Sequence, residues 1–457
     1  MEMANPPRHG RRRATLAALS LPMLLAALGT SSANVALPAL QAGFGAPFAS
    51  VQWVVLAYLL TVSSTVVTAG RLGDLFGRRR LLLAGIALFT CASVACATAP
   101  SLAMLIAARA MQGLGAALMM ALSMALVYDT VAKEQAGTAM GLLGTMSALG
   151  TALGPSLGGA LLDQFGWQAV FLINVPVGLA ALCLACRYLP RIETPAQRQG
   201  VDWLGMLLLA ATLSGYAYAM TSGHAVLLLA AASGLVLLIA HAKRAAAPLI
   251  PLSLLRTRSI GAACAMSALV TTVVMATLVI GPFYLGGALH LRAAQTGLVM
   301  ACGPLVAALA GIPAGRLVDR LGSGRIVLLG LAIMLCGCVA MLASPMLYPV
   351  ASYVGAIAIL TAGYALFQAA NNTAVMAQVQ AEQKGVASGL LNLARNLGLI
   401  SGASLMGALY ALGKNASEGM QYGIAGAAGL TAAALALAIA GRPAIKAAAH
   451  TVHAGRS

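Results

Sequence analysis

Gly70-Arg-Leu-Gly-Asp-Leu-Phe-Gly-Arg-Arg-Arg80 is a short charged stretch between two long apolar runs. It recurs 245 positions later as Gly315-Arg-Leu-Val-Asp-Arg-Leu-Gly-Ser-Gly-Arg325, and the two copies match at six of eleven positions. Glycine suits a tight turn, and charged side chains keep such a turn in water. A turn that recurs in the same orientation indicates two parallel halves of similar structure.

The composition around this repeat is that of a protein embedded in lipid. Of 457 residues, 60% are hydrophobic and only 8% are charged, whereas roughly a quarter are charged in ordinary soluble domains. The net charge of +17 does not indicate nucleic-acid binding, because the basic residues form short runs between apolar stretches. We therefore expect an all-helical membrane protein.

Helices that cross a bilayer need roughly 20 apolar residues. Fourteen segments of the chain meet this requirement: 15–37, 50–69, 81–98, 102–126, 137–160, 168–186, 204–220, 224–240, 261–285, 296–314, 326–343, 348–370, 386–409 and 421–440.

Basic residues give an independent check on this count, because cytoplasmic loops carry an excess of lysine and arginine. With a cytoplasmic N-terminus, all but four of the 27 basic residues fall inside. Arg292 and Lys414 fall outside, and Arg109 and Arg395 lie within spans. The pattern predicts that both termini are cytoplasmic in a multi-pass protein of the plasma membrane, which would be a bacterial inner membrane.

The repeat offset of 245 residues fits eight spans better than six. We therefore predict two six-helix bundles, 1–190 and 256–457, joined by a linker with two additional helices at 191–255.

Polar residues inside the spans are the candidates for a substrate or proton pathway, because charges in a bilayer are costly and usually functional. Arg109 has Gln112 on the same helical face, and a snorkelling arginine is the alternative. Arg395 shares a face with Asn392 and Asn396, where helix–helix hydrogen bonding and substrate contact are both open. The remaining candidates are Asn34, Gln368, Asn371 and Asn372.

Glycines in segment 137–160 recur every fourth residue at Gly150, Gly154 and Gly158, followed by Gly159. Small residues at this spacing let helices approach closely in lipid, and Pro155 loosens the helix. Ordinary tight packing and a gating role both remain open from the residues themselves.

Four motifs resemble those of the major facilitator superfamily, and the fourteen spans are similar to its drug:proton antiporter branch. They are Gly70 to Arg80, Ala108 to Gly113, Gly150 to Gly159, and Trp167 to Gly178. The resemblance covers nearly the whole chain. It implies alternating access by two rocking bundles, and an antiporter role for the glycines of segment 137–160.

The resemblance also implies a cytoplasmic gate. Its residues are Gly70, Asp74, Gly77, Arg78 and Arg79, with Asp319 as the counterpart of Asp74 in the second half.

One position departs from the resemblance. The segment Leu28 to Pro38 is similar to the first-helix motif of that branch, but Gly29 stands where the motif usually has an aspartate. All ten acidic residues fall in loops, tails or span ends. A multivalent cation normally needs a buried carboxylate, so neutral, weakly basic or anionic substrates gain support.

The leading hypothesis is therefore proton-coupled efflux of drugs or other small hydrophobic or amphiphilic molecules, by a monomer without a cofactor or metal. The alternative is a narrow exporter or importer of a neutral or anionic metabolite. ATP is not expected as the energy source, since the sequence has no P-loop motif. An enzyme is disfavoured, since all six histidines lie in loops, tails or span ends and no H-E-x-x-H motif occurs.

Overall fold

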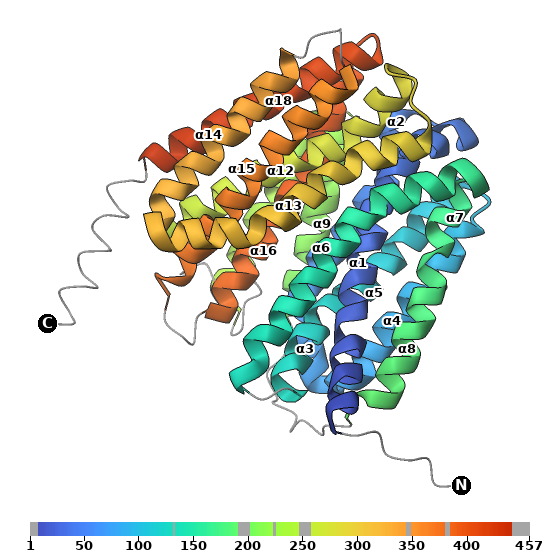
Figure 1. Ribbon diagram of the computed structural model, residues 1–457, viewed down its shortest axis with the longest axis vertical. Helices are drawn as coiled ribbons and strands as arrows, with labels where there is room; N and C mark the ends of the chain where they lie inside the picture. The colour runs from blue at the N-terminus through green and yellow to red at the C-terminus, as the bar shows by residue number, and fades with distance from the viewer. Residues whose placement is uncertain are drawn as a thin grey trace, which may run out of the picture. The chain divides into compact units, whose positions relative to one another are not determined.

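The described residues fold almost entirely into helices (Figure 1). The structure is a computed structural model that describes residues 8–130, 133–190, 202–222, 225–245, 257–343, 349–379 and 384–440. The first ten helices are α1 (Arg8–Phe44), α2 (Phe48–Val51), α3 (Trp53–Phe76), α4 (Arg78–Ala97), α5 (Leu102–Thr130), α6 (Lys133–Phe165), α7 (Trp167–Leu172), α8 (Asn174–Tyr188), α9 (Trp203–Ser222) and α10 (Ala225–Arg244). The others are α12 (Arg258–Gly287), α13 (Ala293–Leu321), α14 (Ser323–Leu342), α15 (Pro349–Met376), α16 (Lys384–Ser401), a π-helix (Gly402–Met406), α17 (Gly407–Ala411) and α18 (Ala416–Ala440).

Twelve helices of the described residues are long and apolar enough to cross a membrane. They coincide with twelve of the fourteen predicted segments. The other two predicted segments, 137–160 and 386–409, are helical as α6 and as α16 to α17, but they are not among the twelve. Glycines dilute the apolar character of α6, and asparagines and an arginine do so in α16. The count of fourteen spans is therefore not supported by these helices, and the supported number is twelve.

The helices group into two compact units. Unit 1 comprises Met1–Pro47, Trp53–Ala210 and Ala293–Gly297, and unit 2 comprises Phe48–Gln52, Ala211–Arg292 and Leu298–Ser457. Helices α1 and α3 to α8 thus belong to unit 1, and α12 and α14 to α18 belong to unit 2. The finer division at 1–190, 191–255 and 256–457 stays a prediction.

The two halves repeat the same local geometry at the same offset as the charged turn. Gly77 precedes α4 with a φ of 90°, and Gly322 precedes α14 with a φ of 83°. This left-handed backbone favours glycine. Eight residues further on, Gly85 of α4 and Gly330 of α14 each lie against a glycine of the next helix.

These glycine pairs set how closely neighbouring helices pack. A Cβ placed on Gly115 of α5 would lie 2.7 Å from the carbonyl oxygen of Gly85. In unit 2, a Cβ on Gly363 of α15 would lie 2.6 Å from the carbonyl oxygen of Gly330. Real Cβ atoms do not approach so closely, so both helix pairs require glycine at the crossing, as is common where helices associate in lipid.

Unit 2 contains a π-helix, Gly402–Met406, between α16 and α17. Such bulges free backbone groups from the helical ladder and are frequent at functional sites. The buried Gln52 Nε2 donates to the Ala403 carbonyl oxygen at 2.8 Å, and Gly407 leaves room for that amide. Beside it, the Phe48 ring packs on Phe283 at a centroid distance of 4.6 Å. Segment Phe48–Gln52 is therefore bonded to and packed against other residues of unit 2.

Helix α10 has few buried residues. Within its apolar window only 11% of residues are buried, against 72% in α12. Val226, Leu229 and Val236 are all more than half exposed. This is expected for a helix that faces lipid over most of its circumference. A peripheral position for α9 and α10 stays a prediction.

The glycine crossing in unit 2 can be tested with a matched pair of alanine substitutions. Gly330→Ala places a methyl group 2.6 Å from the Phe367 backbone nitrogen, and we expect overpacking to cost about 1–3 kcal/mol. Gly355→Ala on α15 meets nothing within 4 Å. Thermal denaturation in detergent should show a lower apparent Tm for Gly330→Ala and an unchanged apparent Tm for Gly355→Ala. Equal midpoints for both variants would contradict the crossing.

Candidate functional site

Arg109 on α5 lies in the interior of unit 1 and is fully buried, with 0% of its surface exposed. Its Nε donates to the Val54 carbonyl oxygen of α3 at 2.8 Å. Its Nη1 donates to the Gly29 carbonyl oxygen of α1 at 3.0 Å and to Gln112 Oε1. The guanidinium therefore joins three helices through hydrogen bonds from a charged donor, which are stronger than neutral ones.

The Tyr58 ring and the amide nitrogen of Gln112 extend this cluster. Arg109 Cζ lies 4.4 Å from the centroid of the Tyr58 ring, a distance at which a cation is attracted to the ring face. Tyr58 in turn donates its hydroxyl to the Ala26 carbonyl oxygen at 2.9 Å. Gln112 Nε2 donates to Ser93 Oγ of α4 at 2.8 Å. The cluster thus connects α1, α3, α4 and α5, and we name it the Arg109 hub.

Gly29 explains why no carboxylate accompanies this arginine. A Cβ on Gly29 would lie 2.8 Å from Phe89 Cζ, so the phenyl ring occupies the space that a side chain would take. Arg109 instead binds the Gly29 backbone oxygen. Its Nη2 is buried and has no hydrogen-bond partner among the residues that the structure describes. Backbone oxygens, one amide oxygen and ring faces therefore compensate the charge.

Arg395 on α16, in unit 2, has a different environment. It is half-buried. When the Gln368 amide is oriented with its oxygen toward Arg395, that oxygen accepts from Arg395 Nε at 3.1 Å and from Nη2. Asn392 and Asn396 share its helix and are also half-buried. The structure thus brings together Arg395 and Gln368, two of the predicted pathway residues.

The other predicted pathway residues are Asn371 and Asn372 of α15 and Asn34 of α1. Asn371 is buried and donates from Nδ2 to the Ala263 carbonyl oxygen of α12 at 3.1 Å, so it ties two helices together. Asn372 is half-buried. Asn34 is buried and donates to the Thr30 carbonyl oxygen of its own helix at 3.2 Å, while its Oδ1 has no partner among the described residues.

The predicted gate residues lie at the turn between α3 and α4. Asp74 forms an ion pair with Arg78, with 2.8 Å between Oδ1 and Nε. Arg79 Nη2 donates to the Cys186 carbonyl oxygen in the last turn of α8 at 2.7 Å, where a cation complements the helix dipole. In the second copy of the turn, Ser323 replaces Arg78, and Asp319 is exposed without that ion pair.

The predicted glycine face of α6 packs along α1. Side chains at Gly150, Gly154 and Gly158 would overlap or press on the backbone and side chains of α1, and Ser31 Oγ donates to the Gly150 carbonyl oxygen at 3.2 Å. Gly159 points elsewhere, toward the first turn of α13, which belongs to unit 1.

The first turn of α13 is also held by a carboxylate. Asp163 Oδ1 accepts from the Ala293 amide at 3.2 Å, and Oδ2 accepts from the Ala294 amide at 3.3 Å. These amides have no partners within α13, because the first turn of a helix leaves its N–H groups free. Helix α6 therefore packs on two helices through different faces.

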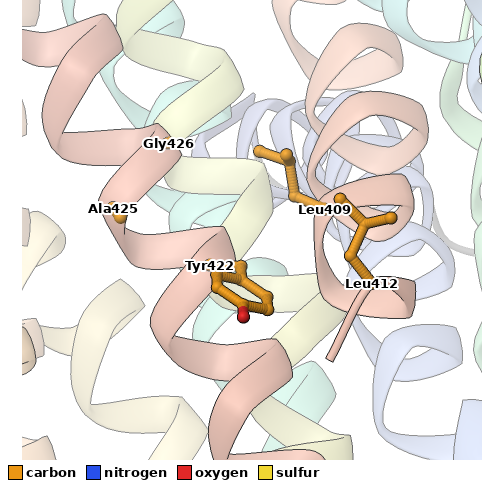
Figure 2. Close-up of a pocket in the computed structure, with 5 residues that line it drawn as sticks. All are labelled: Leu409, Leu412, Tyr422, Ala425 and Gly426. Atoms are coloured by element: carbon orange, nitrogen blue, oxygen red, sulfur yellow. The ribbon is translucent and has the colours of Figure 1, made fainter. Parts of the chain in front are cut away.

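An apolar hollow of about 330 Å³ lies between α17 and α18 (Figure 2). It is lined by Leu409, Leu412, Tyr422, Ala425 and Gly426. Leu412 is 70% exposed, and the only polar side-chain group in the lining is the Tyr422 hydroxyl. The hollow contains none of the predicted site residues and has the character of a surface that lipid tails cover.

Sequence reasoning missed Tyr58, Ser93 and Phe89 around Arg109, and Gln52 in unit 2. Tyr58 and Phe89 read as ordinary apolar positions in their spans, so nothing in their spacing pointed to Arg109. Gln52 carried a weak signal, since it is a polar residue at the start of a predicted span. Its partner Ala403 is 351 positions away, and no local pattern reveals such a pairing.

These features are those of an all-helical, multi-pass membrane protein: two units with repeated helix crossings and with polar clusters inside helices. A sequence profile described as "Major Facilitator Superfamily" matches residues 19–403. The chain belongs to this superfamily and is a transporter, not an enzyme. The superfamily resemblance is therefore confirmed, while membership of the fourteen-span drug:proton branch stays a prediction.

Similar proteins support this assignment. The chain is 33% identical over 408 residues to the "Multidrug resistance protein Stp" of Mycobacterium tuberculosis, covering 87% of this chain and 75% of that protein. It is 30% identical over 442 residues to the "Probable actinorhodin transporter" of Streptomyces coelicolor, covering 92% and 76%. The solved structure of the nucleoside transporter NupG superimposes with a TM-score of 0.69, at 13% identity, over 93% of this chain and 99% of that one. This last similarity concerns the fold alone.

The Arg109 hub predicts a large stability effect. Arg109→Ala removes three hydrogen bonds and takes the arginine donor away from the buried Gln112 Oε1, and we expect a loss of about 2–4 kcal/mol in the free energy of unfolding. Arg395→Ala removes a half-buried arginine with one neutral partner and should cost less. Apparent Tm values in detergent, compared at one scan rate, give the measurement. A larger loss at Arg395 than at Arg109 would show that the hub is not the structural centre of unit 1.

Proposed function

We propose that this chain is a proton-coupled exporter of drugs or other small hydrophobic or amphiphilic molecules, working by alternating access as a monomer. The observation that carries the proposal is the glycine face of α6. Gly150, Gly154 and Gly158 allow α6 to lie on α1 without intervening side chains. Small residues at a helix contact let the two backbones approach closely. The resemblance of this face to the antiporter motif supports export.

Relatives support the class of cargo. Stp is named for multidrug resistance, and the Streptomyces relative for transport of actinorhodin. Similarity over most of this chain supports a drug or another small molecule as the cargo. The polar side chains within its spans are few, which suits cargo that is mainly apolar.

Proton coupling in this chain would need an acceptor other than a deeply buried carboxylate, because all ten acids fall near span ends, in loops or in tails. Arg109 cannot carry the proton by titrating, since arginine stays protonated in proteins. Its role in the proposal is to hold α1, α3, α4 and α5 in register while unit 1 moves as a body.

A narrower cargo is the second candidate, and Gly29 favours it. Phe89 fills the space where a carboxylate could stand, so the site lacks the group that would attract a multivalent cation. A transporter of one neutral or anionic metabolite fits this environment. Export and import are both compatible with it.

For the topology we propose that both termini are cytoplasmic, in a bacterial inner membrane. The distribution of basic residues supports this orientation.

Transport by purified protein in liposomes tests the proposed function. An inward-directed proton gradient should drive efflux of a neutral aromatic dye, and a protonophore should reduce the rate roughly tenfold, toward the leak of protein-free vesicles. A sodium gradient of equal size serves as the control. A panel of anionic, neutral and cationic dyes separates the two candidates, because movement of several chemically different dyes favours the broad exporter. Dye efflux at the same rate with and without the proton gradient would overturn the proposed proton coupling.

Topology has its own test. Cysteines introduced singly at Lys414 and at Arg325 should differ in labelling by a membrane-impermeant thiol reagent applied to whole cells, in a background lacking the eight native cysteines. We expect label at position 414 only, because Arg325 follows a predicted cytoplasmic turn. Label at position 325 instead would invert the proposed orientation.

A further inference from the structure

Arg109 of α5 and Arg395 of α16 differ in what remains available for a ligand. Arg109 is fully buried, and oxygens from two neighbouring helices together with aromatic faces surround it. Arg395 is half-buried, and among the residues that the structure describes its hydrogen bonds go to one oxygen, that of Gln368. A guanidinium has five N–H donors. Gln368 takes two of them, so three remain for another acceptor.

Arg395 lies deep along its helix. It is eleven residues beyond the start of α16 at Lys384, which corresponds to about 16 Å along the helix axis and to roughly half of a bilayer core. A charge at this depth is costly unless it is paired or faces a polar space. One neutral amide oxygen compensates it only in part, so the position favours an additional, negatively charged partner.

Polar side chains continue from Arg395 along both helices. On α15, Tyr364, Gln368 and Asn372 follow one another at intervals of four residues and so share one face. All three are half-buried, whereas the neighbouring Asn371 is buried and bonded to α12. On α16, Asn392 and Asn396 flank Arg395. We name these six residues the Arg395 strip.

We propose that the Arg395 strip binds the anionic group of an amphiphilic cargo, with Arg395 as the charge that recognises a carboxylate or sulfonate. This inference rests on the proposed function and assigns a chemical class to its cargo. The planar guanidinium fork matches the two oxygens of such a group. Gln368 is the positioning residue, because its oxygen accepts from Nε and Nη2 and does not engage Nη1.

Gln368→Glu provides the sharpest test, because it keeps the arginine and changes only its partner. The new carboxylate would neutralise the guanidinium within the protein and compete with an anionic cargo. We expect efflux of anilinonaphthalene sulfonate from liposomes to fall roughly tenfold. Efflux of phenylnaphthylamine, which has the same rings without the sulfonate, should stay near the wild-type rate.

Arg395→Gln should reproduce this selective loss, and Arg395→Lys should retain part of the sulfonate transport because it keeps the charge without the planar fork. Lys414→Gln is the matched control. It removes one positive charge from an exposed position of the same unit and should change neither dye.

The outcomes separate this inference from the proposed function. If the wild-type protein moves phenylnaphthylamine but never the sulfonate, or if Gln368→Glu and Arg395→Gln slow both dyes equally, the anion site is overturned while export stands. If the wild-type protein moves neither dye under any gradient, the proposed function fails. Fluorescence titration of purified protein with the sulfonate dye then tests the site directly, since wild-type protein should bind it more tightly than Gln368→Glu in the same detergent.

Discussion

The buried charge of Arg109 is the constraint on which unit 1 depends. A guanidinium sealed from water must find acceptors inside the protein, and here these are the Val54 and Gly29 carbonyl oxygens and the Gln112 amide oxygen. Those acceptors come from three helices, so the charge can be accommodated only when α1, α3 and α5 meet in one register. Gln112 carries the same requirement to α4 through Ser93. One costly group therefore specifies the packing of four helices.

Glycine allows the backbones of neighbouring helices to approach closely. The crossings of α4 with α5 and of α14 with α15 use reciprocal glycines, so the repeat visible in two charged turns extends into the helix packing. The two charged turns differ in their ion pairing because one residue differs between them. Asp74 has Arg78 as its partner, while Asp319 faces the position of Ser323. The two turns therefore share a backbone but differ in electrostatics, and unit 2 has instead a π-helix bonded to Gln52.

The two arginines within spans show how one residue type can serve two purposes. Both are costly in a bilayer. The Arg109 side chain is internally compensated and acts as structure, whereas Arg395 keeps unused donors beside a row of half-buried polar groups. This division of roles also fits the place of Gly29. With Phe89 against that backbone, unit 1 offers no carboxylate beside its arginine, and the accessible charge of the spans is positive.

Sequence by itself determined that the chain is helical, membrane-embedded and built from two related halves, because hydropathy, basic-residue distribution and the repeated turn are local properties. It also identified Arg109 and Arg395 as unusual, since their cost follows from residue type and depth. Only the tertiary structure decided that Arg109 is fully buried and Arg395 is half-buried. Arg109's backbone acceptors lie 55 and 80 positions away, and the Phe89 ring that closes Gly29 comes from another helix. Helical spacing predicts only neighbours three or four residues apart, so burial and partner choice at these depths come from contacts that sequence patterns do not contain.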